Sequence, residues 1–207
     1  MNLSHNRENP SPRYYELLSQ YQSMHVDGAH GLTGEQTFPG QSLIEHVGTV
    51  LQLVQRYQCE TLLDYGCGKA LLYRPNNDIK LADKSYASVQ ELLGVDVSLY
   101  DPGYLPYAMT PSQVHDIVIC TDVLEHCGAD DIPWIVGELF SYAAKVVFAN
   151  VACYPASKSL PNGENAHCTV EDVAWWRNII EAQAKPGVAY VFICTLADGA
   201  QVVIQSD

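Results

Sequence analysis

From residue 60 onward, short apolar runs alternate with amphipathic stretches, and this alternation is the feature that most constrains the fold. We expect a strand from each apolar run, at 61–65, 95–100, 116–120, 145–151, 189–195 and 200–205. The runs in the middle of the series are nearly continuous in apolar residues, as in strands buried on both faces. The stretches between them predict helices over 131–144 and 170–184, the second opened by a capping box that starts at Thr169. Such alternation favours an α/β fold, with a mostly parallel sheet, helices on both faces and an antiparallel hairpin at the Asp-Gly pair 198–199.

The first 57 residues lie outside this alternation. Residues 1–12 are polar with two prolines and predict a loose arm. Helices are expected over 13–24 and 42–56, with a glycine-rich loop between them. We therefore divide one compact unit into 1–57, a lid or substrate region, and 58–207, which holds the sheet.

The charge distribution argues against two classes of partner. The chain carries 24 acidic and 11 basic residues, a net charge of −13, and the basic residues are scattered along it. Nucleic-acid phosphates require a positive stripe, and an anionic membrane surface requires clustered basic residues. We therefore expect no nucleic acid and no membrane as partner, and a small molecule as substrate.

Two further properties favour the cytoplasm. No apolar stretch is long enough for a membrane span, and the polar start MNLSHNRENPSP lacks the apolar core of a secretory signal. The seven cysteines are odd in number and include no C-x-x-C pair. We therefore expect free thiols in a reducing compartment.

The segment 62–70 reads LLDYGCGKA, a buried strand that runs into a glycine turn. In α/β sheets, ligands bind at the carboxyl ends of the strands, where glycines let the backbone approach them closely. A dinucleotide site would need a third glycine at Leu71, and a phosphate-binding G-x-x-x-x-G-K-[ST] loop is also absent. Asp64, two residues before Gly66, would repel a pyrophosphate and attract an ammonium group. The turn therefore predicts a cationic ligand without phosphate.

Two motifs resemble those of class I S-adenosylmethionine (SAM)-dependent methyltransferases. The first is Asp64-x-Gly66-x-Gly68-x-Ala70, with alanine in place of the last glycine, and the second is D-V-L-E-H at 122–126. The resemblance covers about residues 58–152.

The resemblance implies a Rossmann-like, seven-stranded sheet in a SAM-binding domain over 58–207. It also implies a cofactor site at Asp64, Gly66 and Gly68. A branched side chain at Gly68 is then expected to block SAM and to leave folding largely intact.

Members of this family hold the ribose of SAM with an acidic residue at the end of the second strand. Asp101, where the strand 95–100 stops before Pro102, is the first candidate. Asp96, inside the same strand, is the second. Asp122, in the second motif, is a further cofactor-binding candidate.

His126 and His167 are the candidate catalytic residues. A neutral imidazole can take a proton from an attacking hydroxyl near neutral pH, and His167 lies in a polar loop. His167 can equally hydrogen-bond the start of the following helix. Asp122, Glu125 and His126 would share one face of a helical turn, and with His167 they form an alternative set of ligands for magnesium or manganese, as in a subset of the family. Our first expectation is that no metal binds and that His167 is a general base.

We therefore expect a methyltransferase that transfers the methyl group of SAM to a small-molecule acceptor, at oxygen as the first choice. One alternative is a protein that binds or cleaves SAM without methyl transfer. Another is a catalytically silent binding module, which Ala70 and the irregular stretch 70–94 permit.

Overall fold

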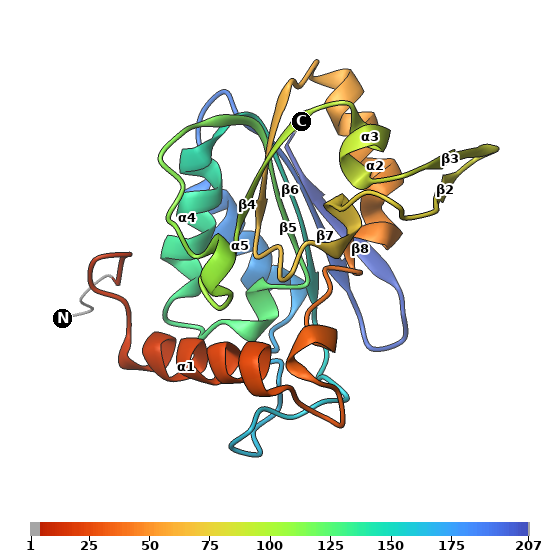
Figure 1. The fold of residues 1–207 in the computed structure, drawn as a ribbon. Coiled ribbons are helices and arrows are strands. Elements are labelled where there is room, and N and C mark those ends of the chain that lie inside the picture. Colours follow the sequence, from red (N-terminus) through yellow and green to blue (C-terminus); the bar gives the residue numbers. More distant parts are fainter. Residues whose placement is uncertain (1–4, 207) are drawn as a thin grey trace.

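The structure, a computed structural model, describes residues 5–206, which form a sheet flanked by helices (Figure 1). The strands are β1 (Thr61–Tyr65), β2 (Ile79–Leu81), β3 (Lys84–Tyr86), β4 (Asp96–Tyr100), β5 (His115–Thr121), β6 (Ala143–Ala152), β7 (Ala189–Thr195) and β8 (Gln201–Gln205). The α-helices are α1 (Pro12–Asp27), α2 (Leu43–Arg56), α3 (Val89–Leu93), α4 (Ile132–Tyr142) and α5 (Val173–Gln183). Within this described part of the chain, no helix is long and apolar enough to cross a membrane.

The main sheet has the strand order β4-β1-β5-β6-β7-β8. Every neighbouring pair is parallel except the closing β7–β8 hairpin. This arrangement confirms the α/β fold, the mostly parallel sheet and the antiparallel hairpin. The main sheet has six strands where the resemblance implied seven.

Residues 70–94 explain the smaller sheet. They form a 3-10 turn at Leu71–Tyr73, a separate antiparallel ribbon of β2 and β3, and the short helix α3. The ribbon projects from the body of the molecule (Figure 1). Each of its strands has three residues, and the stretch RPNNDIK at 74–80, which runs into β2, is too polar to supply a buried strand.

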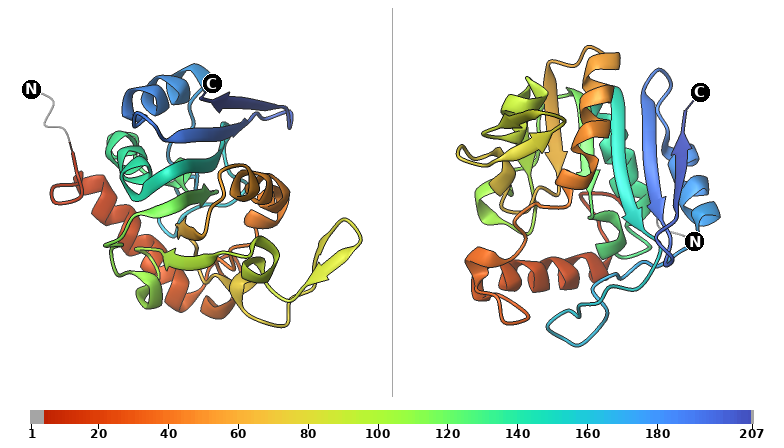
Figure 2. Two further views of the ribbon diagram at one scale, coloured as in Figure 1. Left: turned by 90° about the horizontal axis from the view of Figure 1, so that it is seen from above. Right: turned by 90° about the vertical axis from the view of Figure 1, so that its right-hand side faces the viewer.

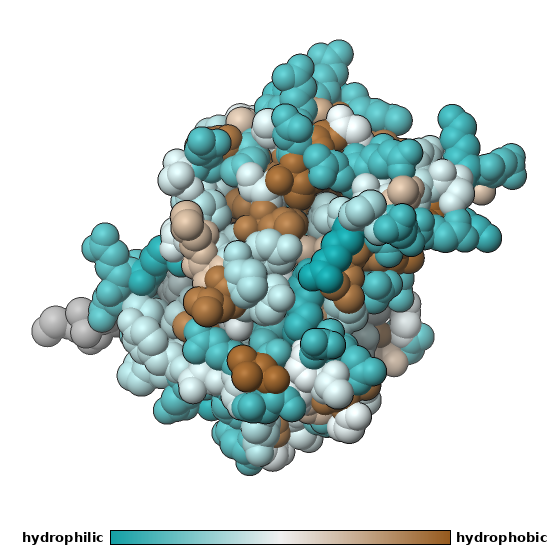
Figure 3. Space-filling model, in the orientation of Figure 1, coloured by the Kyte–Doolittle hydropathy of each residue, from teal (hydrophilic) through white to brown (hydrophobic). Residues whose placement is uncertain are grey.

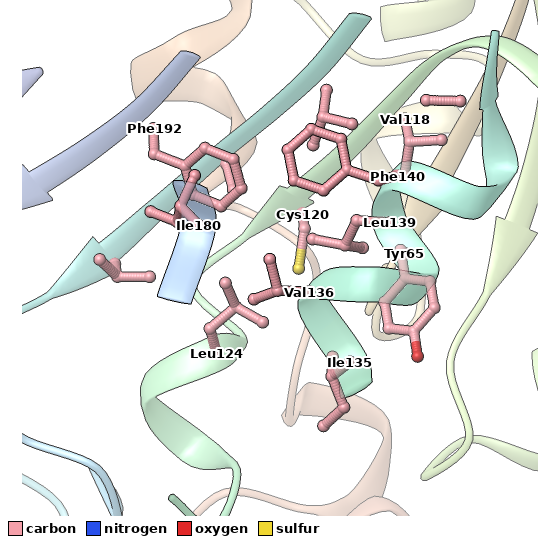
Figure 4. Close-up of a cluster of buried hydrophobic side chains, with 14 of the residues drawn as sticks. Tyr65, Val118, Cys120, Leu124, Ile135, Val136, Leu139, Phe140, Ile180 and Phe192 are labelled. Carbon is pink, nitrogen blue, oxygen red and sulfur yellow. The ribbon is translucent and has the colours of Figure 1, made fainter. Parts of the chain in front are cut away.

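Helices cover both faces of the sheet, as the two views of Figure 2 show. On one face, α4 and α5 pack on the sheet through a large buried cluster, part of which is drawn in Figure 4. On the other face, α2 and α3 pack through a second buried cluster. The sheet is therefore buried on both faces, which accounts for the nearly continuous apolar sequence of β5 and β6.

The start of α5 differs from the expected capping box. Asp172 is the residue that caps the helix, because its side chain accepts the N–H of Trp175 at 2.8 Å. Thr169 donates its hydroxyl to the Cys127 carbonyl at 2.7 Å. Thr169 thus joins the loop before α5 to the segment after β5 and caps no helix.

The expectation of a loose arm over 1–12 is wrong for residues 5–12, whereas residues 1–4 lie outside the described part. The Arg7 guanidinium pairs with Glu138 of α4 and donates to the hydroxyls of Tyr65 and Tyr100. The buried Ser11 binds the buried carboxylate of Asp131. Polar sequence predicted a solvated arm, but the side chains of Arg7 and Ser11 find partners on the body of the protein.

Helix α1 crosses the carboxyl ends of the parallel strands (Figure 1). It is held there by a small buried cluster in which Leu17 and Met24 meet Leu160 and Ala166. The side of the molecule that faces the viewer in Figure 1 is mostly hydrophilic, with hydrophobic residues exposed between the hydrophilic ones (Figure 3). The N-terminal region therefore covers the edge of the sheet where the glycine turn lies.

Phe148 of β6 tests the contribution of the core. Its side chain is fully buried, so Phe148→Ala should lower the free energy of unfolding by about 3–5 kcal/mol. Val203 of β8 is 47% exposed, and Val203→Thr should change that free energy by less than about 0.5 kcal/mol. Urea denaturation of both variants measures the difference, and equal losses would contradict this packing.

Candidate functional site

The glycine turn follows β1 at the carboxyl edge of the sheet, where β1 lies between β4 and β5. The chain continues from β1 to β4 on one side of the sheet and from β5 to β6 on the other. The position between β1 and β5 is therefore a topological switch point, the usual ligand position in open α/β sheets. Gly66 and Gly68 have left-handed φ angles of 87° and 57°. A Cβ at Gly66 would lie 2.4 Å from the Val123 side chain, and one at Gly68 would lie 2.4 Å from the Phe38 carbonyl oxygen. Both glycines are therefore required by close approach of the protein's own segments.

Asp64 is buried under this turn, with 4% of its surface exposed. Its Oδ2 accepts a hydrogen bond from the Tyr73 hydroxyl at 2.9 Å. Its Oδ1 is buried and has no hydrogen-bond partner among residues 5–206. Burial raises the pKa of Asp64 to about 7, against the opposing effect of the Tyr73 hydrogen bond. A buried carboxylate oxygen without a partner is costly, and a bound ammonium group would satisfy it.

The two acidic candidates of the second strand lie at opposite ends of β4. Asp101 follows the strand at the carboxyl edge, and its two oxygens accept the N–H groups of Gly68 and Gly103, each at 2.8 Å. Burial raises the pKa of Asp101. Asp96 is the exposed first residue of β4, and its N–H donates to the Glu60 carbonyl at the amino edge. Only Asp101 therefore reaches the glycine turn.

Lys69 belongs to the turn but was not among the sequence candidates. Its buried ammonium donates to the Thr37 carbonyl at 2.9 Å and lies 2.9 Å from His25 Nδ1. Burial, followed by the Lys69 charge, lowers the pKa of His25 to about 4, so His25 accepts as a neutral imidazole. Sequence spacing could not reveal this contact, because Thr37 and His25 precede Lys69 by 32 and 44 positions.

A second group of titratable side chains lies after β5. Asp122, His126 and His167 each offer one ligand atom, and these atoms lie within 4.8 Å of one another. Asp122 has a left-handed φ of 59°, which is uncommon for a non-glycine residue and occurs often at functional sites. The structure therefore brings together three of the four residues in the alternative metal set.

The hydrogen bonds of both histidines fix their tautomers. His126 Nδ1 lies 2.9 Å from the Ala166 carbonyl oxygen, and His167 Nδ1 lies 2.6 Å from the Tyr154 carbonyl oxygen. A carbonyl oxygen can only accept, so each Nδ1 carries a proton, and in the neutral form of each ring Nε2 has a free lone pair. Burial also lowers the pKa of His126, which keeps its ring neutral. Two bare imidazole nitrogens beside a carboxylate can bind a divalent cation or take a proton from a substrate.

Glu125 does not join this group. Its side chain is fully buried, and its Oε1 accepts the N–H of Ala152 at 2.7 Å. Burial, and then the charge of Asp122, raises the pKa of Glu125 to about 8. The four-residue metal set is therefore wrong at this position, because Glu125 turns toward the end of β6 to satisfy a backbone group.

Tyr21 of α1 is a further neighbour of the histidine pair, and sequence reasoning assigned no candidate role to it. Its hydroxyl lies 2.8 Å from His126 Nδ1, and its ring packs edge-on against both His126 and Phe38. Tyr21 thus connects the helix over the carboxyl edge with the histidine pair. Tyr14 and Tyr21 are two helical turns apart in the sequence, and this spacing does not distinguish a packing tyrosine from one that contacts a site.

The expectation that a side chain at Gly68 leaves folding intact is contradicted by its contact with Phe38. We predict that Gly68→Ala lowers the free energy of unfolding by more than Gly94→Ala, measured by urea denaturation. Gly94 also has a left-handed φ, 66°, but a Cβ there meets nothing within 4 Å. Gly94→Ala should therefore cost only the backbone strain, about 1–2 kcal/mol. Equal losses would mean that Phe38 does not lie against the turn.

Comparison with known proteins does not place this chain in a family. No model of a protein family matches it, and no curated protein sequence matches it. The function therefore has to be argued from the site itself.

Proposed function

We propose that this protein is a SAM-dependent methyltransferase with its cofactor site at the glycine turn. The observation that carries the proposal is the buried Asp64 Oδ1, which lacks a hydrogen-bond partner within the described residues. It lies directly before Gly66 and Gly68, at the switch point of the sheet. An ammonium group of SAM is a ligand that would satisfy this oxygen.

The surrounding residues fit the remaining parts of SAM. Asp101 uses one lone pair on each oxygen for Gly68 and Gly103, and a carboxylate has about four, so it retains capacity for ribose hydroxyls. Asp122 ends β5 at the same edge of the sheet and remains exposed. When bound, SAM would supply a methyl group on a sulfonium, which is already activated for transfer to a nucleophile.

His167 is the proposed general base, with His126 beside it. Their ring centroids are 4.9 Å apart, and the free Nε2 of each can accept a proton from an acceptor hydroxyl. A small-molecule acceptor methylated at oxygen fits this pair. Residues 1–57 would then form the lid and substrate region over the domain 58–207. The seven free cysteines agree with a cytoplasmic location.

A metal at Asp122, His126 and His167 is a second reading of the same group. The donor set is one carboxylate and two imidazoles, and each histidine already donates its other nitrogen to a carbonyl, as metal ligands commonly do. Two imidazoles favour a transition ion over magnesium, and the carboxylate also suits manganese. Such an ion could orient an acceptor oxygen and lower its pKa.

One observation favours a binding module without catalysis. The N–H groups of Lys69 and Leu71 donate to the carbonyls of Phe38 and Pro39, so the turn is engaged by the chain itself. A protein in which this contact never opens would bind no SAM.

Product analysis with labelled SAM separates methyl transfer from cleavage, because transfer yields S-adenosylhomocysteine.

Asp64→Asn tests the cofactor site. The variant removes the charge but keeps an acceptor for Tyr73, so calorimetry should find SAM binding weakened at least about tenfold. In the wild type, affinity should rise with pH through about 7, as Asp64 ionises. Unchanged affinity in Asp64→Asn would remove the basis of the proposal.

Asp64→Asn should weaken SAM binding but should increase the stability of the folded protein at neutral pH. Because the folded pKa of Asp64 is raised, the wild type loses stability as pH rises from about 4 to about 7. Asp64→Asn lacks this loss, so its free energy of unfolding relative to wild type should increase by up to about 4 kcal/mol across that range. Urea denaturation of both proteins at about pH 4.5 and about pH 8 measures this difference in the free energy of unfolding. A constant difference would mean that Asp64 is not buried as an acid.

Chelation separates the two readings of the histidine pair. For a general base, chelator should leave turnover unchanged, and His167→Ala should lower it about 10²–10⁴-fold with SAM affinity retained. For a metal, chelator should abolish turnover, and manganese should restore it. His30→Ala, at an exposed histidine outside this group, is the matched control and should behave as wild type. Full activity of His167→Ala without metal would contradict both readings.

A further inference from the structure

Residues 37–40 lie along the glycine turn as a strap. The Phe38 carbonyl accepts the N–H of Lys69 at 2.8 Å, and the Pro39 carbonyl accepts the N–H of Leu71 at 3.1 Å. A Cβ on Gly40 would lie 3.0 Å from the Cys67 carbonyl oxygen. The strap therefore contacts the turn through backbone atoms at close range.

The strap accepts two N–H groups of the turn, and the other N–H groups of the turn have acceptors elsewhere. The N–H groups of Gly66 and Cys67 donate to the Tyr100 carbonyl. Those of Gly68 and Ala70 donate to the Asp101 carboxylate and the Cys67 carbonyl. The N–H groups of Lys69 and Leu71 are thus the two donors of the turn whose acceptors lie on the strap. Only these two become free if the strap moves.

Lys69 also clamps the strap from its side. Its ammonium donates to both the carbonyl and the hydroxyl oxygen of Thr37, and it lies over the rings of Phe38 and Tyr104. The ammonium is a strong donor held in a buried place, so its contacts with Thr37 and Phe38 favour the closed strap. The clamp and the two backbone hydrogen bonds act on the same few residues.

The strap is closed against its own backbone preference. Phe38 has a φ of 48°, and a left-handed conformation is unfavourable for a bulky residue. Gly40, with a φ of 79°, supplies a second left-handed position. The contacts with the turn therefore maintain this strained conformation of the strap.

We propose that residues 37–40 are a gate that occupies the glycine turn in the free protein and lifts when a ligand binds there. Lifting frees two N–H donors and releases the Lys69 ammonium from Thr37, at the turn that follows Asp64 with its unpaired oxygen. Two N–H donors and an ammonium can bind a carboxylate of the ligand, and Asp64 can bind an ammonium of the ligand. The gate therefore selects a ligand that carries an α-amino acid group, an inference that rests on the proposed function for the identity of SAM.

Amide hydrogen exchange by NMR on the free, full-length protein tests the gate without any ligand. The N–H groups of Lys69 and Leu71 should exchange together and at least about tenfold faster than those of Gly68 and Ala70, because only the first pair is freed by local opening. Thr37→Val removes one acceptor of the Lys69 ammonium and should speed exchange of that pair alone. Thr110→Val, at an exposed loop threonine, is the control and should change neither pair. Equal exchange of all four amides, or equal acceleration of all four in Thr37→Val, overturns the gate.

SAM binding to the same variants tests what the gate covers. The strap and SAM compete for the glycine turn, and loosening the strap weakens this competition. Thr37→Val should therefore bind SAM several-fold more tightly than wild type in calorimetry. Faster exchange with unchanged SAM affinity would show that the strap opens but does not cover the ligand site, and it would overturn the gate. Absence of SAM binding in both proteins would overturn the proposed function, whereas the exchange rates would still decide whether the strap opens.

Discussion

The parallel pairing of β1 with both β4 and β5 is the constraint on which the candidate site depends. Because the three strands run in the same direction, their carboxyl ends meet at one edge, and Asp64, Asp101 and Asp122 arrive there from distant parts of the sequence. The Tyr100 carbonyl at the end of β4 then accepts two N–H groups of the turn that follows β1. The geometry of the turn is thus a consequence of strand pairing, and the glycines adapt the backbone to it.

The sequence predicted those parts of the fold that rest on local pattern. Continuous apolar runs predicted the strands of the main sheet, and the Asp-Gly pair predicted the closing hairpin, because burial on both faces and a tight turn each leave a local signature. The number of strands was wrong because it came from resemblance, whereas the polar segment RPNNDIK at 74–80 already interrupted the stretch between β1 and β4. Asp101 could be preferred to Asp96 for a local reason as well, since Pro102 ends the strand.

The parts that could not be predicted depend on contacts across long sequence separations. The partners of Lys69 are residues of the N-terminal region, and nothing in the sequence around Lys69 indicates them. Glu125 and His126 are adjacent in the chain, yet one turns toward the end of β6 and the other toward His167. A helical-face argument treats neighbours on a turn alike, whereas Glu125 accepts the N–H of Ala152 and the His126 ring packs against His167.

The anchorage of Arg7 has a consequence for the order in which the protein assembles. Its partners Tyr65, Tyr100 and Glu138 all follow it in the chain, the last by 131 positions. During synthesis from the N-terminus, Arg7 therefore leaves the ribosome well before any of them, and it cannot settle until β1, β4 and α4 have come together. Since α1 begins a few residues after Arg7, the helix that covers the carboxyl edge is fixed only late in folding. A nascent chain of this protein would thus expose its glycine turn to the surroundings for longer than its finished form does.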